Sequence, residues 1–234
     1  MKRLVILDID QTLIHSVDKP AGADSGGRKR GRFTIRVGRG VAPFYVFERT
    51  FLQYFLKRLR RLISDSFRVA VWTAAQPDYA KKVLDQIWPS WADELMFLYC
   101  FSKCTTLPSG HVVKDLRKLP HGYDTLLVDD NPSTYSLNTR NNFSVWKMRP
   151  FTYDENVVDR ELLDVLDHIT DSIVRELPFG VRPKTPRGLA SRPSSPARSS
   201  PRLSAKSSSS PSASPSASPS SSPSASSRPS ARRA

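Results

Sequence analysis

The chain has 234 residues, in which 36 Lys and Arg outnumber 22 Asp and Glu and give a formal charge of +14 at pH 7. Two cysteines, Cys100 and Cys104, exclude a disulfide framework and suit a reducing compartment. No apolar segment approaches the ~20 residues of a membrane-spanning helix, and Met1-Lys2-Arg3 leads directly into an apolar run, which predicts no signal peptide. We therefore expect a location in the nucleus or the cytoplasm.

The first predicted element is a buried strand in the stretch RLVILDID, residues 3–10, because its apolar run contains β-branched residues. Residues 17–48 then form a predicted insertion, which opens with a Gly-rich basic loop. Its second part, residues 33–47, alternates around Gly38-Arg39-Gly40, a pattern typical of a β-hairpin.

Predicted helices and strands alternate through the rest of the first 180 residues. Residues 49–63 and 77–88 carry helical apolar stripes, and residues 153–177 predict a long amphipathic helix. Apolar runs at 67–73, 125–130 and 143–148 predict buried strands. Such strands between helices favour an α/β fold, a Rossmann-like parallel sheet flanked by helices, with a small β-hairpin insertion after the first strand.

Residues 181–234 differ in composition from everything before them. They hold ten Lys and Arg, no acid and no aromatic residue among mostly Ser, Pro and Ala, so little offsets the entropy of ordering them. We predict a folded domain at 1–180, with a charge of +4, and a disordered tail at 181–234. The tail's charge favours contact with nucleic acid or acidic proteins, a solubilising extension being the alternative, and its six Ser-Pro pairs predict phosphorylation.

Polar residues follow several of the predicted strands. Because parallel strands present their carboxyl ends at one edge of a sheet, side chains that end different strands converge there. Several carboxylates around one point repel one another and require a hard cation, for which Mg²⁺ is the ordinary choice. A lysine and hydroxyl groups beside that cation provide a binding site for a phosphoryl group. The residues predicted to converge are Asp8, Asp10, Thr12, Thr73, Lys114, Asp129 and Asp130.

These side chains have predicted parts in the hydrolysis of a phosphoester. Asp8 attacks phosphorus and forms an aspartyl-phosphate, and Asp10 protonates the leaving oxygen and later deprotonates water. Thr12, Thr73 and Lys114 bind the phosphoryl oxygens, whose charge Mg²⁺ neutralises. Taken singly, the same residues are typical of strand-end turns, helix caps and solvated charges. Only their convergence points to this chemistry.

Four ordered stretches, LDIDQTLIHS, VWTAAQPDYAKKVLD, VVKDL and LLVDDNPSTY, resemble the motifs of haloacid-dehalogenase-superfamily phosphatases. More narrowly, residues 3–176 resemble the branch of the RNA polymerase II C-terminal-domain (CTD) phosphatases and their small relatives. The resemblance implies a Mg²⁺-dependent phosphoserine/phosphothreonine phosphatase for a phosphoprotein or phosphopeptide, the polymerase CTD being one candidate. It also implies a set of metal ligands: Asp8, Asp10 through its backbone carbonyl, Asp129 and Asp130.

Two departures from that branch bear on substrate choice. Its members usually carry Arg-Pro before the first helix, where this chain has Arg49-Thr50. Many carry an Arg shortly before the residue that matches Cys104, where this chain reads CFSKC and offers Lys103. We therefore carry over no preference for particular phosphoserines. A phosphatase of nucleic-acid ends and a non-catalytic phosphopeptide-binding module are the alternative functions.

Overall fold

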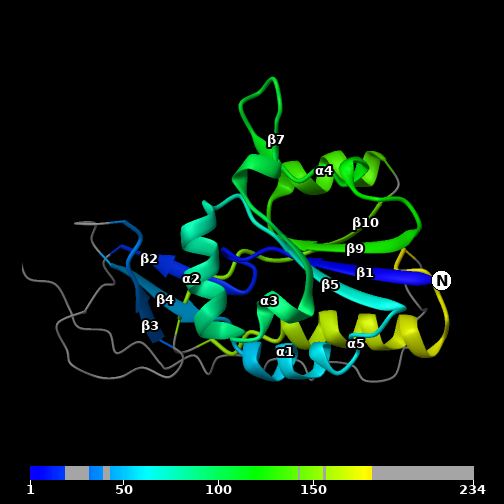
Figure 1. Ribbon diagram of the computed structural model, residues 1–234, viewed down its shortest axis with the longest axis horizontal. Coiled ribbons are helices and arrows are strands. Elements are labelled where there is room, and N and C mark those ends of the chain that lie inside the picture. Colours follow the sequence, from blue (N-terminus) through cyan, green and yellow to red (C-terminus); the bar gives the residue numbers. More distant parts are fainter. Residues whose placement is uncertain (19–31, 39–42, 142, 155–156, 181–234) are drawn as a thin grey trace, which may run out of the picture. The chain divides into compact units, whose positions relative to one another are not determined.

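The computed structural model describes residues 1–18, 32–38, 43–141, 143–154 and 157–180. The predicted disordered tail at 181–234 lies outside these ranges, as does most of the predicted Gly-rich loop. Within them, no helix is both long enough and apolar enough to cross a bilayer. The α/β architecture predicted from the sequence is confirmed (Figure 1).

A five-stranded sheet in the order β10-β9-β1-β5-β6 forms the centre of the fold. All neighbouring strands pair in parallel, with Ile6 opposite Ala70 on one side and Leu127 on the other. Both faces of β1 are buried, which explains its unbroken apolar run. The four predicted strands are confirmed as β1, β5, β9 and β10. The strands of the sheet are β1 (Lys2–Leu7), β5 (Phe67–Trp72), β6 (Leu95–Tyr99), β9 (Tyr123–Asp129) and β10 (Ser144–Lys147).

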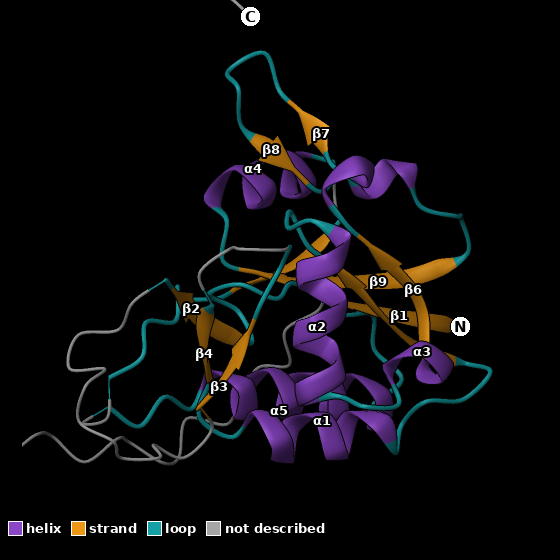
Figure 2. Cartoon of the chain, turned by 60° about the vertical axis from the view of Figure 1, so that its left-hand side comes forward, coloured by secondary structure: helices purple, strands orange, loops and turns teal. Residues whose placement is uncertain are grey.

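Helices cover both faces of this sheet (Figures 1 and 2). On the face of β1 that carries Val5 and Leu7, a large core buries the apolar stripes of α1 (Leu52–Arg60), α2 (Pro77–Ile87) and α5 (Glu161–Val174). The face that carries Leu4 and Ile6 packs on a smaller core around the 3-10 helix η2 (Leu116–Lys118), with α4 (Pro132–Arg140) beside it. The three predicted helices are confirmed, although α5 starts at Glu161 rather than near residue 153.

The insertion, with the residues just before it, forms a second, antiparallel sheet in the order β2-β4-β3, which we name the insertion sheet. Its strands are β2 (Ile14–Val17), β3 (Arg32–Ile35) and β4 (Phe44–Glu48). The predicted hairpin corresponds to β3 and β4, and its turn at Arg39-Gly40 lies outside the described residues. The third strand, β2, was not predicted. Because β2 comes soon after β1, this sheet begins close to the carboxyl edge of the central sheet.

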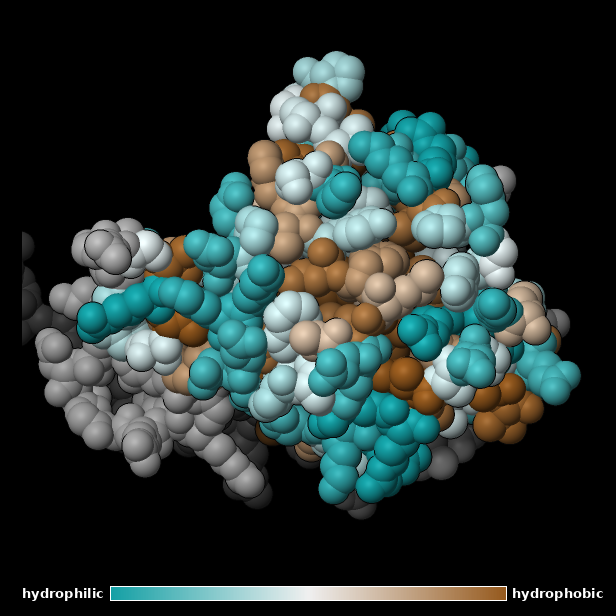
Figure 3. All heavy atoms as spheres, viewed as in Figure 1, coloured by the Kyte–Doolittle hydropathy of each residue, from teal (hydrophilic) through white to brown (hydrophobic). Residues whose placement is uncertain are grey.

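Several elements between residues 91 and 113 were also not predicted. They are α3 (Trp91–Glu94), β6, the 3-10 helix η1 (Phe101–Lys103), β7 (Thr105–Thr106) and β8 (Val112–Val113). All five residues of β6 are half-buried, and in the space-filling view apolar side chains are visible over the middle of the sheet (Figure 3). Residues 95–99 are an unbroken apolar run, but they follow α3 directly, so no turn residues mark where this strand begins.

Candidate active site

The carboxyl ends of β1, β5 and β9 meet at one edge of the central sheet, as predicted. Asp8 follows β1 and donates its backbone N–H to Val128 of β9 at 3.0 Å. Thr73 follows β5 and donates its N–H to Tyr99 of β6 at 2.9 Å, and Asp129 is the last residue of β9. Backbone pairing therefore holds each strand end in place.

Three carboxylates gather at this edge. One oxygen from each of Asp8, Asp129 and Asp130 lies within 4.8 Å of the others. The ammonium of Lys114 lies 2.6 Å from Oδ1 of Asp8 and 2.6 Å from Oδ2 of Asp129. These three paired side chains are almost completely buried. We name Asp8, Lys114, Asp129 and Asp130 the acidic cluster.

The acidic cluster carries more negative charge than its single lysine balances. Burial raises the pKa of Asp8 well above its ordinary value, with Lys114 opposing the rise and Asp129 adding to it. Burial and the charge of Asp129 also raise the pKa of Asp130. Burial alone would lower the pKa of Lys114, but the carboxylates of Asp8 and Asp129 outweigh that effect and raise it. A further positive charge would stabilise the ionised carboxylates.

The ligand atoms of the acidic cluster fit a hard divalent cation. The group consists of carboxylate oxygens alone, the ligand type that Mg²⁺ prefers at about 2.1 Å. Their mutual spacing suits ligands around one ion. The carboxylate of Asp10 lies outside this group of three, so its backbone carbonyl is the atom left for the predicted metal contact.

The hydroxyl groups of Thr12 and Thr73 lie at the same edge with different partners. Thr12 Oγ1 lies 3.3 Å from Oδ1 of Asp130 and 3.5 Å from Oδ2 of Asp8, so it links two carboxylates of the acidic cluster. Thr73 Oγ1 accepts the backbone N–H of Ala75 at 3.0 Å, in the turn that leads to α2. Contact of either hydroxyl with a phosphoryl group stays a prediction.

Asp10 is held by two hydroxyl groups that the sequence did not indicate. Its Oδ1 accepts a hydrogen bond from Tyr79 of α2 at 2.5 Å and one from Ser16 of β2 at 3.3 Å. Burial raises the pKa of Asp10, and these two hydrogen bonds oppose the rise. No local pattern could have revealed the Tyr79 contact, because 69 positions separate the two residues.

The loop after β1 is held by Arg49, whose side chain is fully buried. Its Nη1 donates to the backbone carbonyls of Gln11 at 3.3 Å and Thr12 at 3.0 Å. Its Nε and Nη2 donate to Asp159 and Glu161, at the start of α5. Gln11 has a left-handed backbone, with φ 59°, which is unusual for a non-glycine residue. The Arg49 hydrogen bonds help to hold that conformation.

Lys103 and Cys104, in the stretch CFSKC that differs from the CTD phosphatase branch, lie at the edge of the site. Lys103 is exposed, and its ammonium lies 5.9 Å from the centroid of the Tyr99 ring. Ion pairs within the described ranges do not join Lys103 to the acidic cluster. The thiol of Cys104 lies 3.7 Å from the carbonyl oxygen of Thr73, and burial raises the pKa of that thiol. Among the described residues, Lys114 is thus the lysine that forms ion pairs with the carboxylates of the acidic cluster.

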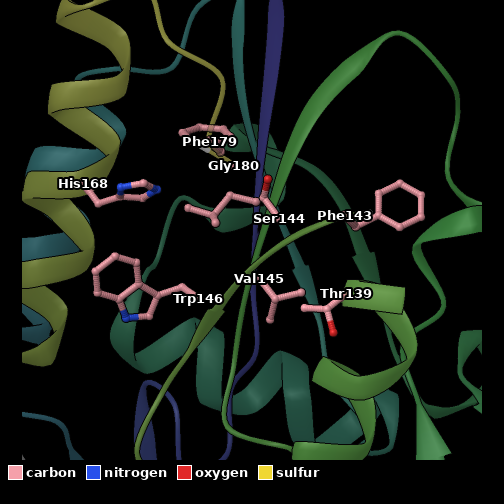
Figure 4. Close-up of a pocket in the computed structure, with 9 residues that line it drawn as sticks. Thr139, Phe143, Ser144, Val145, Trp146, His168, Phe179 and Gly180 are labelled. Carbon is pink, nitrogen blue, oxygen red and sulfur yellow. The ribbon is translucent and has the colours of Figure 1, made fainter. Parts of the chain in front are cut away.

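A pocket lies away from the acidic cluster, toward the amino end of β10. It is lined by Ser144, the first residue of β10, and by the rings of Trp146, His168 and Phe179 (Figure 4). The His168 ring centroid lies 5.2 Å from that of Trp146 and 6.2 Å from that of Phe179. No carboxylate is among its described lining residues, so the pocket does not belong to the candidate metal site.

A sequence model of the family described as NLI interacting factor-like phosphatase matches residues 3–177. The human carboxy-terminal domain RNA polymerase II polypeptide A small phosphatase 1 is 29% identical over 171 residues, which cover 70% of this chain and 57% of that protein. A CTD phosphatase-like protein of Invertebrate iridescent virus 3 is 29% identical over 182 residues, covering 70% of this chain and 93% of its own length.

Among solved structures, that of Fcp1, an essential RNA polymerase II CTD phosphatase, matches with a TM-score of 0.50 at 22% identity, over 71% of this chain and 49% of that one. This likeness bears on the fold alone. The chain spans about half the length of curated relatives from Dictyostelium discoideum and Homo sapiens, 51% and 54% respectively. Because the family's sequence model covers most of the chain, the chain belongs to the NLI interacting factor-like phosphatase family.

Proposed function

We propose that the chain is a Mg²⁺-dependent protein phosphatase for phosphoserine and phosphothreonine, which works through an aspartyl-phosphate on Asp8. The observation that carries the proposal is the acidic cluster, in which three carboxylates gather where the strands end and one ammonium pairs with two of them. Membership of a phosphatase family supports the reaction class. Because one relative is named as a small phosphatase of the RNA polymerase II CTD, that domain is the first protein substrate to test.

In the first step, Asp8 attacks the phosphorus atom of the bound phosphoester. Lys114 engages Oδ1 of Asp8 at 2.6 Å, which leaves Oδ2 to attack. A bond forms between Oδ2 and phosphorus, and the bond from phosphorus to the serine or threonine oxygen breaks. A protonated Asp10 donates its proton to that leaving oxygen. Burial, which raises the pKa of Asp10, favours the protonated form before this step.

In the second step, water attacks the phosphorus atom of the aspartyl-phosphate. Asp10, now ionised, accepts a proton from the water, and the bond between phosphorus and Asp8 breaks. Inorganic phosphate leaves, while Asp8 regains its carboxylate and Asp10 its proton. Lys114 and the hydroxyl of Thr73 contact the phosphoryl oxygens in both steps. A bound Mg²⁺ supplies positive charge against those oxygens, and its proposed ligands are Asp8, Asp129, Asp130 and the backbone carbonyl of Asp10.

The test is phosphate release from a phosphoserine-proline peptide by the full-length chain, with Mg²⁺ and with EDTA. We expect release that requires Mg²⁺ and that falls at least about 10³-fold in Asp8→Asn. The matched control is Asp65→Asn, which changes an exposed carboxylate in the loop after α1 and should leave release unchanged. Equal release by the wild type and Asp8→Asn would exclude the aspartyl mechanism.

A phosphatase of nucleic-acid ends is the second candidate, favoured by the ten Lys and Arg of residues 181–234. A 3′- or 5′-phosphorylated oligonucleotide in the same assay separates the two candidates, since each predicts turnover of its own substrate. Binding of the phosphopeptide without release, in the presence of Mg²⁺, would favour a non-catalytic binding module. A nuclear location and contacts of the tail with nucleic acid or acidic proteins stay predictions.

A further inference from the structure

The carboxylate of Asp10 is held on one oxygen. The Tyr79 hydroxyl lies 2.5 Å from Oδ1, and the Ser16 hydroxyl lies 3.3 Å from the same atom and 2.8 Å from the Tyr79 hydroxyl. Each hydroxyl group carries one proton, so both can donate to Oδ1 at once. Hydrogen bonds to Oδ2 are absent among the residues that the structure describes. Oδ2 is therefore the oxygen open to another partner.

Tyr79 and Ser16 come from two different elements that meet beside the site. The Tyr79 ring is 8% exposed, and it meets the ring of Phe44 edge to face with centroids 5.6 Å apart. Phe44 lies on β4, and Ser16 lies on the neighbouring strand β2. Burial raises the pKa of Tyr79, so its hydroxyl keeps the proton that it donates. Asp10 is thus clamped between the first turn of α2 and the insertion sheet.

We propose that Tyr79 and Ser16 are positioning residues for proton transfer. By holding Oδ1, they turn Oδ2 of Asp10 toward the oxygen that leaves with the serine or threonine. This inference rests on the proposed role of Asp10 as acid and base. A carboxylate turns easily about its last side-chain torsion, whose minima are broad, and a misplacement of about 1 Å can lower a rate about 10²-fold. Two hydroxyl groups on one oxygen remove that freedom.

The two hydrogen bonds to Oδ1 of Asp10, which we name the clamp, predict that the effect of losing one of them on the reaction rate depends on the leaving group. The serine oxygen is a poor leaving group unless it receives a proton, so a phosphoserine peptide needs a correctly oriented Asp10. p-Nitrophenolate is stable as an anion and leaves p-nitrophenyl phosphate without protonation. Loss of one hydroxyl of the clamp should therefore slow the first substrate much more than the second. A general defect in folding or metal binding would slow both.

The experiment measures kcat/KM for both substrates with the full-length chain and Mg²⁺, because kcat/KM includes only the steps up to departure of the leaving group. We expect Tyr79→Phe to lower kcat/KM about 10- to 100-fold for the phosphoserine peptide and less than about 3-fold for p-nitrophenyl phosphate. Ser16→Ala should act in the same direction but less, because its hydrogen bond is longer. Tyr54→Phe, at a half-exposed ring on α1, is the matched control and should change neither value.

A double mutant separates orientation of Asp10 from any other effect of the ring. In an Asp10→Asn background the acid is absent, so Tyr79→Phe should lower kcat/KM no further. Three results would overturn the clamp: an equal loss for both substrates, no loss in Tyr79→Phe, or the full additional loss in Asp10→Asn. Failure of the proposed function looks different, because wild-type release would then be absent or would not require Asp8, and the inference would fall with it.

Discussion

Two groups of charge, each built around buried side chains, flank the loop that follows β1, and they are built in opposite ways. The acidic cluster sets three carboxylates against one ammonium. The second group, which we name the Arg49 cluster, sets the buried guanidinium of Arg49 and the exposed guanidinium of Arg149 against the carboxylates of Asp159 and Glu161. Opposite charges balance in the Arg49 cluster and do not balance in the acidic cluster.

The difference indicates which of the two groups is complete without a ligand. Every nitrogen of the Arg49 guanidinium has an acceptor, either a carboxylate or a backbone carbonyl. A buried ion pair with its hydrogen bonds satisfied is self-contained. In the acidic cluster, by contrast, burial holds the pKa of Asp8 high; Asp129 adds to the rise, and Lys114 opposes it without cancelling it. We therefore expect ligand binding at the unbalanced group and mechanical support from the balanced one.

The largest expected effect is that of Lys114→Met, which removes the ammonium from the acidic cluster. Asp8 and Asp129 each lose a partner at 2.6 Å, and a buried charge left alone costs about 3–5 kcal/mol. We expect a loss of that size in the free energy of unfolding, measured by urea titration without Mg²⁺. Phosphate release should fall about 10²- to 10³-fold, and Mg²⁺ should restore part of the stability. If Lys114→Met were as stable as the wild type without Mg²⁺, the acidic cluster would not lack positive charge.

Arg49→Met breaks the balanced group instead. It leaves Asp159 and Glu161 without their buried partner, so the free energy of unfolding should fall by about 3–5 kcal/mol. Mg²⁺ should not restore this loss, because no metal site is expected there. Glu161 still pairs with Arg149, so the double variant Arg49→Met/Asp159→Asn removes the carboxylate that has lost its ion-pair partner and should recover part of the stability. Equal rescue of Arg49→Met and Lys114→Met by Mg²⁺ would mean that the two clusters do not differ in kind.

Most of the central sheet could be predicted because its strands are buried on both faces. β1, β5 and β9 appear in the sequence as short apolar runs, and the helices between them favour parallel pairing. β6 was missed although residues 95–99 are an unbroken apolar run, because that run follows the four-residue helix α3 directly, with no loop between them to mark the start of a strand. The start of α5 was also placed too early. Asp159 accepts the N–H of Glu161 and binds Arg49, a tertiary contact that helps to set where this helix begins.

The acidic cluster could be predicted from the same pattern, since carboxylates that end parallel strands must converge. Tyr79 and Arg49 could not. Their partners stand 69 and 110 positions away along the chain, Asp10 for the first and Asp159 for the second. In the sequence, Tyr79 is an ordinary residue of an amphipathic helix, and Arg49 matches an Arg of the CTD phosphatase branch without any sign of its partners. Only the packing of the insertion sheet and α5 around the loop gives them their partners.

Binding of Mg²⁺ to the acidic cluster should have a smaller effect on stability than the loss of Lys114 or Arg49. A ligand present at 100 times its Kd stabilises the folded state by about 2.7 kcal/mol, so Mg²⁺ should raise the unfolding temperature of the wild type relative to EDTA. Asp130→Asn removes a charge from one of the three gathered carboxylates and should weaken that increase. Asp65→Asn should leave it unchanged. An undiminished increase in Asp130→Asn would place the cation outside the acidic cluster.

Thr73→Ala tests whether a neutral group at the same edge shares in the chemistry. The Thr73 hydroxyl is buried and accepts the N–H of Ala75, so its loss should cost about 1–2 kcal/mol of unfolding free energy. If the hydroxyl also contacts the phosphoryl group, kcat/KM should fall about 10-fold, and Thr73→Ser should retain both properties. Lower stability with unchanged kcat/KM would limit Thr73 to the turn.

The smallest expected effect is that of Arg60→Met, which repeats the substitution made at Arg49 in an exposed ion pair. Arg60 meets Glu94 at 2.6 Å, but the two side chains are 42% and 24% exposed, and such pairs contribute about 0–1 kcal/mol. Glu94 also keeps hydrogen bonds from Trp88 and Ser90, so the substitution strands no buried charge. Urea titration should therefore separate Arg60→Met from Arg49→Met. If Arg60→Met lost more than about 2 kcal/mol, ion pairing alone would govern stability, and the burial of Arg49 would no longer explain its larger effect.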